Sequence, residues 1–145
     1  LGWLNTFQGI IAAYVALALP LAVWILTTFF KEIPYEIEEA SWVDGCTRLQ
    51  ALRKVVLPLA APGIFTSSIL VFILAWNEFF FALLILTSPE IQTLPVGIAL
   101  FPGEYTMPWG EIAAACTIAT IPLVALTLLF QQRIVRGLSA GAVKG

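Results

Sequence analysis

Three residues whose side chains could bind a solute or take part in chemistry lie inside one long apolar stretch. Asn77 and Glu78 are the strongly polar pair in the run Leu57–Leu86, and Trp76 precedes them. A carboxylate at membrane depth is costly and normally faces a bundle interior or a water-filled cavity. Carboxylate and amide oxygens could accept hydrogen bonds from solute hydroxyls, and the indole offers a flat face. We therefore predict that the three residues line a solute path, although an interhelical hydrogen bond that only fixes packing would also account for them.

The other polar residues argue against catalysis. The chain has no histidine, and neither Cys46 nor Cys116 has a second cysteine nearby. An intramembrane enzyme would need a nucleophile with a base, or a set of metal ligands. We therefore expect no catalytic residue, disulfide, metal or cofactor, and no nucleic-acid partner. An ion-coupled secondary transporter or a channel, with Glu78 as the proton or cation site, stays open on these residues alone.

The composition places these residues in a membrane protein. Hydrophobic residues make up 60% of the 145 residues and charged residues 11%, whereas a soluble domain has about 25% charged residues. The mean hydropathy is +0.95. Three apolar stretches, 9–30, 57–86 and 112–130, each reach the roughly 20 residues that cross a bilayer as a helix. We predict an all-α, polytopic membrane protein with three transmembrane helices, the first and third kinked at Pro20 and Pro122.

The basic residues indicate how these spans are oriented. All seven lie in two segments, one between the first and second spans and one after the third; they are Lys31, Arg48, Arg53, Lys54, Arg133, Arg136 and Lys144. Basic residues stay on the cytoplasmic side of a membrane, so we expect a cytoplasmic loop over 31–56 and a cytoplasmic tail over 131–145. Residues 87–110 would be extracytoplasmic, with a short helix around Val96–Phe101. Because the chain begins with Leu1 and no signal peptide, we expect a fragment of a longer protein.

The loop over 31–56 carries signals for two helices. A helix is predicted over Tyr35–Val43, because Pro34 suits a first helical position and Gly45 the position after a helix end. Thr47 and Gln50 form the pattern of a capping box, which predicts a second helix from Thr47. An apolar stripe would hold this second helix at the cytoplasmic membrane surface, and Leu57-Pro58 would then bring the chain back into the membrane. On these features alone, a hairpin that merely anchors two spans is an equally good interpretation.

The same loop resembles the EAA loop of ABC importer permeases. Their pattern is Glu-Ala-Ala, a glycine four residues on and, after nine more residues, Ile-x-Leu-Pro. The matching residues here are Glu39-Ala40-Ser41, Asp44-Gly45 and Val55-Val56-Leu57-Pro58. The departures are Ser41 for the second alanine and Val55 for isoleucine. The whole chain is also similar to the MalG-like sugar permeases, including the segments Ala75–Leu83 and Leu138–Gly145.

The resemblance implies the C-terminal half of an about six-helix permease, forming part of one ABC-importer transmembrane domain in a bacterial or archaeal cell membrane. The chain has no phosphate-binding loop, so cytoplasmic ATP-binding cassette subunits would hydrolyse ATP. Other implied partners are a second, different permease subunit, an extracytoplasmic solute-binding protein, a sugar substrate and the lipid bilayer. The tail over 131–145 would either reach between the ATPase subunits or be a basic end without that role. By position, the residues coupled to the ATPase are Glu39, Ala40, Ser41, Asp44, Gly45, Leu57 and Pro58.

Overall fold

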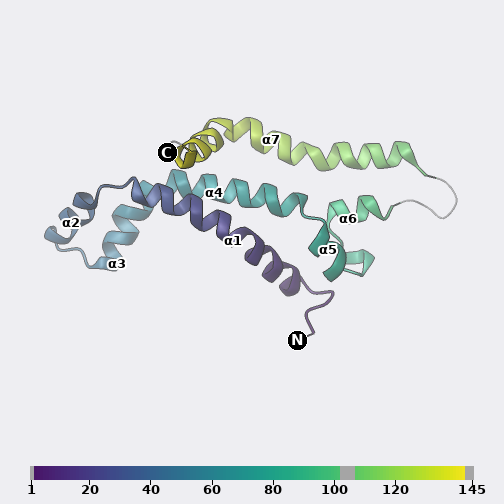
Figure 1. The fold of residues 1–145 in the computed structure, drawn as a ribbon, viewed down its shortest axis with the longest axis horizontal. Helices are drawn as coiled ribbons and strands as arrows, with labels where there is room; N and C mark the ends of the chain where they lie inside the picture. Colours follow the sequence, from purple (N-terminus) through teal and green to yellow (C-terminus); the bar gives the residue numbers. More distant parts are fainter. Residues whose placement is uncertain (1, 102–106, 143–145) are drawn as a thin grey trace. The chain divides into compact units, whose positions relative to one another are not determined.

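The computed structural model describes the backbone of residues 2–101 and 107–142, with side chains up to residue 131. All regular elements in this part of the chain are helices, which confirms the all-α prediction (Figure 1). The long helices are α1 (Phe7–Lys31), α4 (Leu57–Asn77) and α7 (Trp109–Ala142). The shorter elements are α2 (Tyr35–Val43), α3 (Arg48–Ala51), the π-helical η1 (Leu52–Val56), α5 (Phe80–Ile85), the 3-10 helix η2 (Pro89–Ile91) and α6 (Leu94–Ala99).

Three helical segments of the described residues are long and apolar enough to cross a membrane. They are Phe7–Lys31, Arg48–Asn77 and Trp109–Gln131. The number agrees with the three predicted transmembrane helices. Pro20 lies inside α1 and Pro122 inside α7, and neither ends its helix.

The chain divides into two compact units, and the boundaries between them fall inside the three long helices. Unit 1 comprises Leu1–Leu19 and Phe72–Leu129, and unit 2 comprises Pro20–Val71 and Phe130–Gly145. Each unit has its own packing and its own candidate site.

Unit 1 is built around a small apolar core. Ile10 of α1, Ala82 of α5, Leu86 directly after α5 and Val96 of α6 are buried together. Burial of such side chains is the main term that holds short helices in place, because a helix of about six residues is not stable alone. The short helix predicted around Val96–Phe101 is thus present as α6, and it begins and ends two residues earlier.

A polar clamp also ties the start of unit 1 to the end of α5. Asn5 has a φ of 55°, and its N–H donates to the carbonyl of Ile85 at 2.8 Å. Its Oδ1 accepts hydrogen bonds from the N–H groups of Thr87 and Ser88 at 2.7 and 2.9 Å. Asparagine tolerates the left-handed conformation better than most residues. The residues before α1 and after α5 are therefore held together.

Unit 2 brings the second half of α1 against the first half of α4. A Cβ added at Gly63 would overlap the ring of Phe29, so glycine allows the two helices to approach closely at this point. Ile25 of α1 is only 1% exposed. The rings of Phe65 and Phe130 meet edge to face, with centroids 4.8 Å apart. These contacts fix the helices from which the loop of unit 2 projects.

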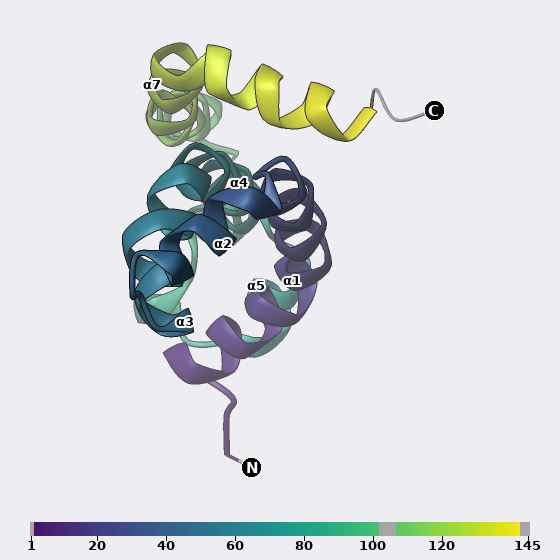
Figure 2. The ribbon, with the colours of Figure 1, turned by 90° about the vertical axis from the view of Figure 1, so that its left-hand side faces the viewer.

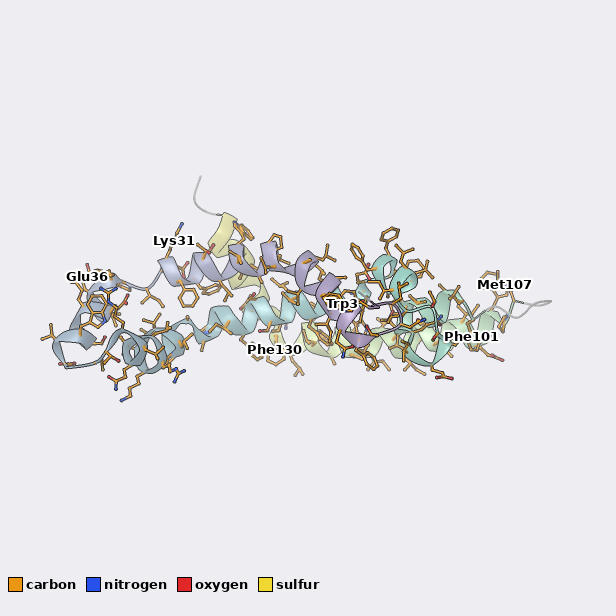
Figure 3. The ribbon with its side chains drawn as sticks, turned by 90° about the horizontal axis from the view of Figure 1, so that it is seen from below. Trp3, Lys31, Glu36, Phe101, Met107 and Phe130 are labelled. Carbon is orange, nitrogen blue, oxygen red and sulfur yellow. The ribbon has the colours of Figure 1, made fainter. Side chains whose placement is uncertain are left out.

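We call residues Tyr35–Val56 the helical hairpin; it comprises α2, a turn, α3 and η1. α2 packs against α3 and η1 (Figures 1 and 2). Ala51 is fully buried. Lys31 at the end of α1 and Glu36 in the first turn of α2 are both exposed (Figure 3). α2 has the bounds predicted from the sequence.

The structure differs from the predicted span over 57–86 near its end. α4 ends at Asn77, and α5 begins at Phe80. We call the two residues between them, Glu78 and Phe79, the helix break. The Glu78 carboxylate accepts hydrogen bonds from backbone N–H groups of α5, which supplies partners for donors that a helix start leaves free. A polar side chain therefore starts a new helix inside an apolar run.

The structure also differs from the prediction at the start of the second span and at the end of the third. No non-helical residue separates α3, η1 and α4, so Leu57 and Pro58 do not separate a surface helix from the membrane span. α7 continues through the predicted tail as far as Ala142. Residues 143–145, which end the segment Leu138–Gly145, lie outside the described residues, as do 102–106 of the loop over 87–110.

Candidate functional sites

The turn of the helical hairpin is closed by backbone hydrogen bonds around Gly45. The N–H of Gly45 donates to the carbonyl of Trp42, and the N–H of Cys46 to that of Ser41, each at 3.0 Å. This pair of bonds is the Schellman motif, which needs a left-handed residue after the helix. Gly45 has a φ of 87°, and a Cβ there would meet no atom within 4 Å. The backbone conformation alone therefore selects glycine, and the predicted helix end at Asp44-Gly45 is confirmed.

The second helix of the hairpin begins with the predicted capping box. The side chain of Thr47 accepts a hydrogen bond from the N–H of Gln50 at 3.4 Å. The Gln50 side chain in turn accepts one from the N–H of Thr47 at 2.9 Å. The two bonds satisfy donors at the helix start, so the turn is fixed on both sides.

The structure divides the predicted coupling residues of the hairpin into two groups. Glu39, Ala40, Asp44 and Gly45 are exposed. Ser41 is only 6% exposed, and its hydroxyl donates to the carbonyl of Glu38 at 2.7 Å. The serine therefore packs inside the hairpin, and the exposed group is accessible on its surface. The other two predicted residues, Leu57 and Pro58, lie at the start of α4.

Two features of the hairpin were not predicted. Val43, the last residue of α2, is 89% exposed, which is costly for an apolar side chain in water. The Trp42 ring meets Tyr35 edge to face with centroids 5.9 Å apart, and the Arg48 guanidinium lies 5.5 Å from the Trp42 ring centroid. The electron-rich face of an indole ring attracts a cation that lies over it. Trp42 therefore connects the two helices. Its spacing from Arg48 gave no signal because the two residues belong to different helices.

The Glu78 carboxylate is occupied by the start of α5. Its Oε1 accepts a hydrogen bond from the N–H of Phe81 at 2.9 Å, and its Oε2 one from the N–H of Ala82 at 3.1 Å. The negative charge also meets the positive end of a helix dipole. Glu78 is thus placed to hold the helix break.

Trp76 and Asn77, by contrast, lie at one small cavity of unit 1. The Trp76 indole N–H donates to the carbonyl of Ala119 in α7 at 3.2 Å, and its ring lies 5.4 Å from that of Phe72. The Asn77 amide donates to the carbonyl of Ile73 at 2.8 Å. The cavity has a volume of about 230 Å³ and is lined by Trp76, Asn77, Pro95, Ile98, Cys116, Ala119, Thr120 and Leu123.

The structure therefore brings together two of the three predicted path residues. Glu78 does not line the cavity, while Cys116 and Thr120 do. Sequence reasoning gave these two α7 residues no function, and they lie about 40 residues after Asn77. Their four-residue spacing on one helix face was the available signal.

Comparison with known proteins decides the class of this membrane protein. The family model for inner membrane components of binding-protein-dependent transport systems matches residues 1–140. The chain belongs to this family. The resemblance to importer permeases is thereby confirmed, and the candidate span helices belong to a transport component of the membrane.

Individual members of the family are similar over the whole chain. The trehalose/maltose transport system permease protein MalG of Thermococcus litoralis is 51% identical over 100% of this chain and 52% of its own length. The trehalose transport system permease protein SugB of Mycobacterium tuberculosis is 48% identical over 100% of this chain and 54% of its own. The sulfoquinovosyl glycerol transport system permease protein SmoH of Agrobacterium fabrum is 47% identical over 100% of this chain and 51% of its own. The chain spans about half the length of these relatives.

Proposed function

We propose that the chain is part of the permease subunit of an ATP-driven importer that moves a sugar or oligosaccharide into the cell. Family membership and the sugar-containing solutes in the relatives' names support the class of transporter and of substrate. The observation that carries the proposal is the hairpin, in which a glycine-closed turn leaves the side chains of Glu39, Ala40 and Asp44 exposed.

In this proposal the helical hairpin faces the cytoplasm. The basic residues on and beside it support that side, because basic loops are retained in the cytoplasm. Residues 87–110, with η2 and α6, face outward, where a solute-binding protein delivers the sugar. The end of α7 returns to the cytoplasm. A second, different permease subunit completes the transmembrane path.

The hairpin docks on a cytoplasmic ATP-binding cassette subunit and transmits its closure to the membrane spans. Glu39, Ala40, Asp44 and Gly45 form the docking surface, while Ser41 packs α2 inside the hairpin. A hairpin closed by a Schellman motif and a capping box can move as one body. Because α3, η1 and α4 are continuous, that movement reaches α4 without passing through a flexible link.

Trp76 and Asn77 contribute to the sugar path at the other site. A cavity of about 230 Å³ is smaller than the roughly 300–1,000 Å³ of a ligand pocket, so this chain holds one part of the sugar and the partner permease the rest. Glu78 acts on the path indirectly, by holding the helix break. Its use as a proton or cation site would require its carboxylate to release two backbone N–H groups, which disfavours an ion-coupled carrier.

Two substitutions at Gly45 test the coupling role in the complete importer, reconstituted in liposomes. Gly45→Val places a β-branched residue at a φ of 87°, a conformation that costs a side-chain-bearing residue about 1–2 kcal/mol. We expect sugar-stimulated ATP hydrolysis and sugar uptake to fall about tenfold, within the range of allosteric couplings. Membrane insertion should stay normal.

Gly45→Asn is the matched control, because asparagine tolerates the left-handed conformation. It should retain most of the coupling. A remaining loss would report a clash with the ATPase, since no atom of this chain lies within 4 Å of an added Cβ. Parental uptake and normal ATPase stimulation in Gly45→Val would show that the hairpin does not couple transport to hydrolysis.

A further inference from the structure

The helix that leaves the hairpin contains one wide turn. From Arg48 to Asn77 every residue is helical, but Leu52–Val56 form a π-helix. The N–H of Leu57 donates to the carbonyl of Leu52, five residues back, where a regular α-helix would use the fourth. Such a turn holds one residue more than the α-helical turn it replaces, and short π segments often mark functional positions.

A proline just beyond this turn explains why it is wide. Pro58 is the second residue after Val56, has no N–H to donate, and its ring would clash with the carbonyl of Lys54 in a regular α-helix. Widening the preceding turn moves that carbonyl out of the way. The helix therefore continues through Pro58 instead of ending there. Pro62, four residues further on, lies inside α4 without a π segment of its own.

The extra residue changes the direction in which the hairpin projects. Each residue of an α-helix adds a rotation of about 100° and a rise of about 1.5 Å. α2 packs against both α3 and η1, and Ala51 at the end of α3 is fully buried. A change of register between η1 and α4 would therefore turn the hairpin about the α4 axis together with its exposed residues.

We propose that Pro58 is a positioning residue: it maintains the π turn Leu52–Val56 and thereby sets the rotation of the helical hairpin about α4, so that the exposed face of α2 meets the ATPase. This rests on the proposed coupling function of the hairpin. Pro58 itself need not touch the ATPase, because it acts through the register of the helix.

In the complete importer, one variant can remove the π turn and a second can restore the original direction of the hairpin. Pro58→Ala supplies the missing N–H and removes the ring, so the turn can become α-helical and rotate the hairpin. Combining Pro58→Ala with deletion of Lys54, an exposed residue of the π turn, removes the extra residue and returns the hairpin to its original direction on a regular α-helix. Pro62→Ala is the matched control, because it removes a proline from the same helix outside the π turn.

The readouts are the yield of assembled complex and the ATP hydrolysis stimulated by sugar and solute-binding protein. Pro58→Ala should lose about tenfold in stimulated hydrolysis, within the range of allosteric couplings, or should fail to assemble with the ATPase. The Lys54 deletion with Pro58→Ala should restore assembly and most of the stimulation. Pro62→Ala should behave as the parent.

Two results would overturn the inference: parental stimulation in Pro58→Ala, or no better assembly and stimulation in the deletion variant than in Pro58→Ala alone. Gly45→Val, measured alongside, separates the two proposals. If Gly45→Val uncouples the importer while Pro58→Ala does not, only the register role of Pro58 fails. If Gly45→Val also couples normally, the coupling function of the hairpin fails with it.

Discussion

The helical hairpin and the cavity at Trp76 and Asn77 both place polar groups in an apolar chain, yet they are held by contacts of different range. The hairpin is closed by residues close together in sequence, such as Cys46 with Ser41 and Thr47 with Gln50. The residues before the break depend on distant elements, since the Trp76 indole bonds to Ala119 of α7. A locally closed element can move without losing its shape, while a site built from several helices changes when those helices move. The first arrangement suits an element that transmits movement as a rigid body, and the second suits a solute path that opens and closes.

The largest expected difference is in accessibility from outside the cell, because the hairpin and η2 should lie on opposite sides of the membrane. Single cysteines replace Glu36 in the hairpin and Glu90 in η2, in a complete subunit that lacks Cys46 and Cys116. Both native glutamates are exposed. In intact cells an impermeant thiol reagent should label the cysteine at 90 and leave that at 36 unlabelled until the cells are opened. The reverse pattern would place the hairpin outside the cell and end the comparison.

Removing the carboxylate at the helix break should come next in size. Glu78→Ala leaves two backbone N–H groups of α5 without their acceptor, which should cost about 1–3 kcal/mol for each buried group that stays unsatisfied. Thermal unfolding of the purified complex measures the loss as a lower transition temperature. Glu78→Gln keeps one acceptor oxygen and should lose less.

Glu90→Gln is the control, since it removes an exposed carboxylate from the same unit and should leave the transition temperature unchanged. If Glu78→Ala is as stable as the parent but prefers a different sugar, the carboxylate contacts the solute and our assignment of Glu78 to the helix break is wrong.

A change at Asn77 should have the smallest effect. Asn77→Ala removes one hydrogen-bonding group from the cavity wall, and a single hydrogen bond contributes about 1 kcal/mol, or roughly a fivefold change in an affinity. We expect the half-saturating sugar concentration for uptake to rise by about that factor while the maximal rate changes little. Ser68→Ala, which removes an exposed hydroxyl from the same helix, should leave both quantities unchanged. Equal effects of the two substitutions would exclude a solute contact by Asn77.

The same difference in range explains what could be predicted from the sequence. The bounds of α2, the end at Gly45 and the Thr47–Gln50 capping box are determined by neighbouring residues, so a sequence pattern indicates them. The cavity residues could not be grouped from the sequence, because Asn77 and Thr120 come from separate helices that line the same cavity. The same holds for the bonds from Asn5 to Thr87 and Ser88.

Two local features were nevertheless misjudged. Glu78 caps α5 through residues three and four positions later, but it lies one residue before the N-cap Phe79, where a capping side chain is not expected. The apolar run around it suggested one continuous span. Pro58 was expected to separate a surface helix from the span, whereas the π turn before it lets the helix continue. Both the helix break and the π turn are irregular backbone conformations that average residue preferences do not indicate.

The separate tasks of the two regions can be tested most directly by the number of ATP molecules hydrolysed per sugar imported. The measurement uses the complete importer in liposomes at saturating sugar, with Gly45→Val in the hairpin and Asn77→Ala at the cavity. Our account predicts that Gly45→Val lowers stimulated hydrolysis about tenfold or raises this ratio, and that Asn77→Ala leaves the ratio at the parental value. A parental ratio with normal hydrolysis in Gly45→Val, or the same change of ratio in both variants, would contradict it.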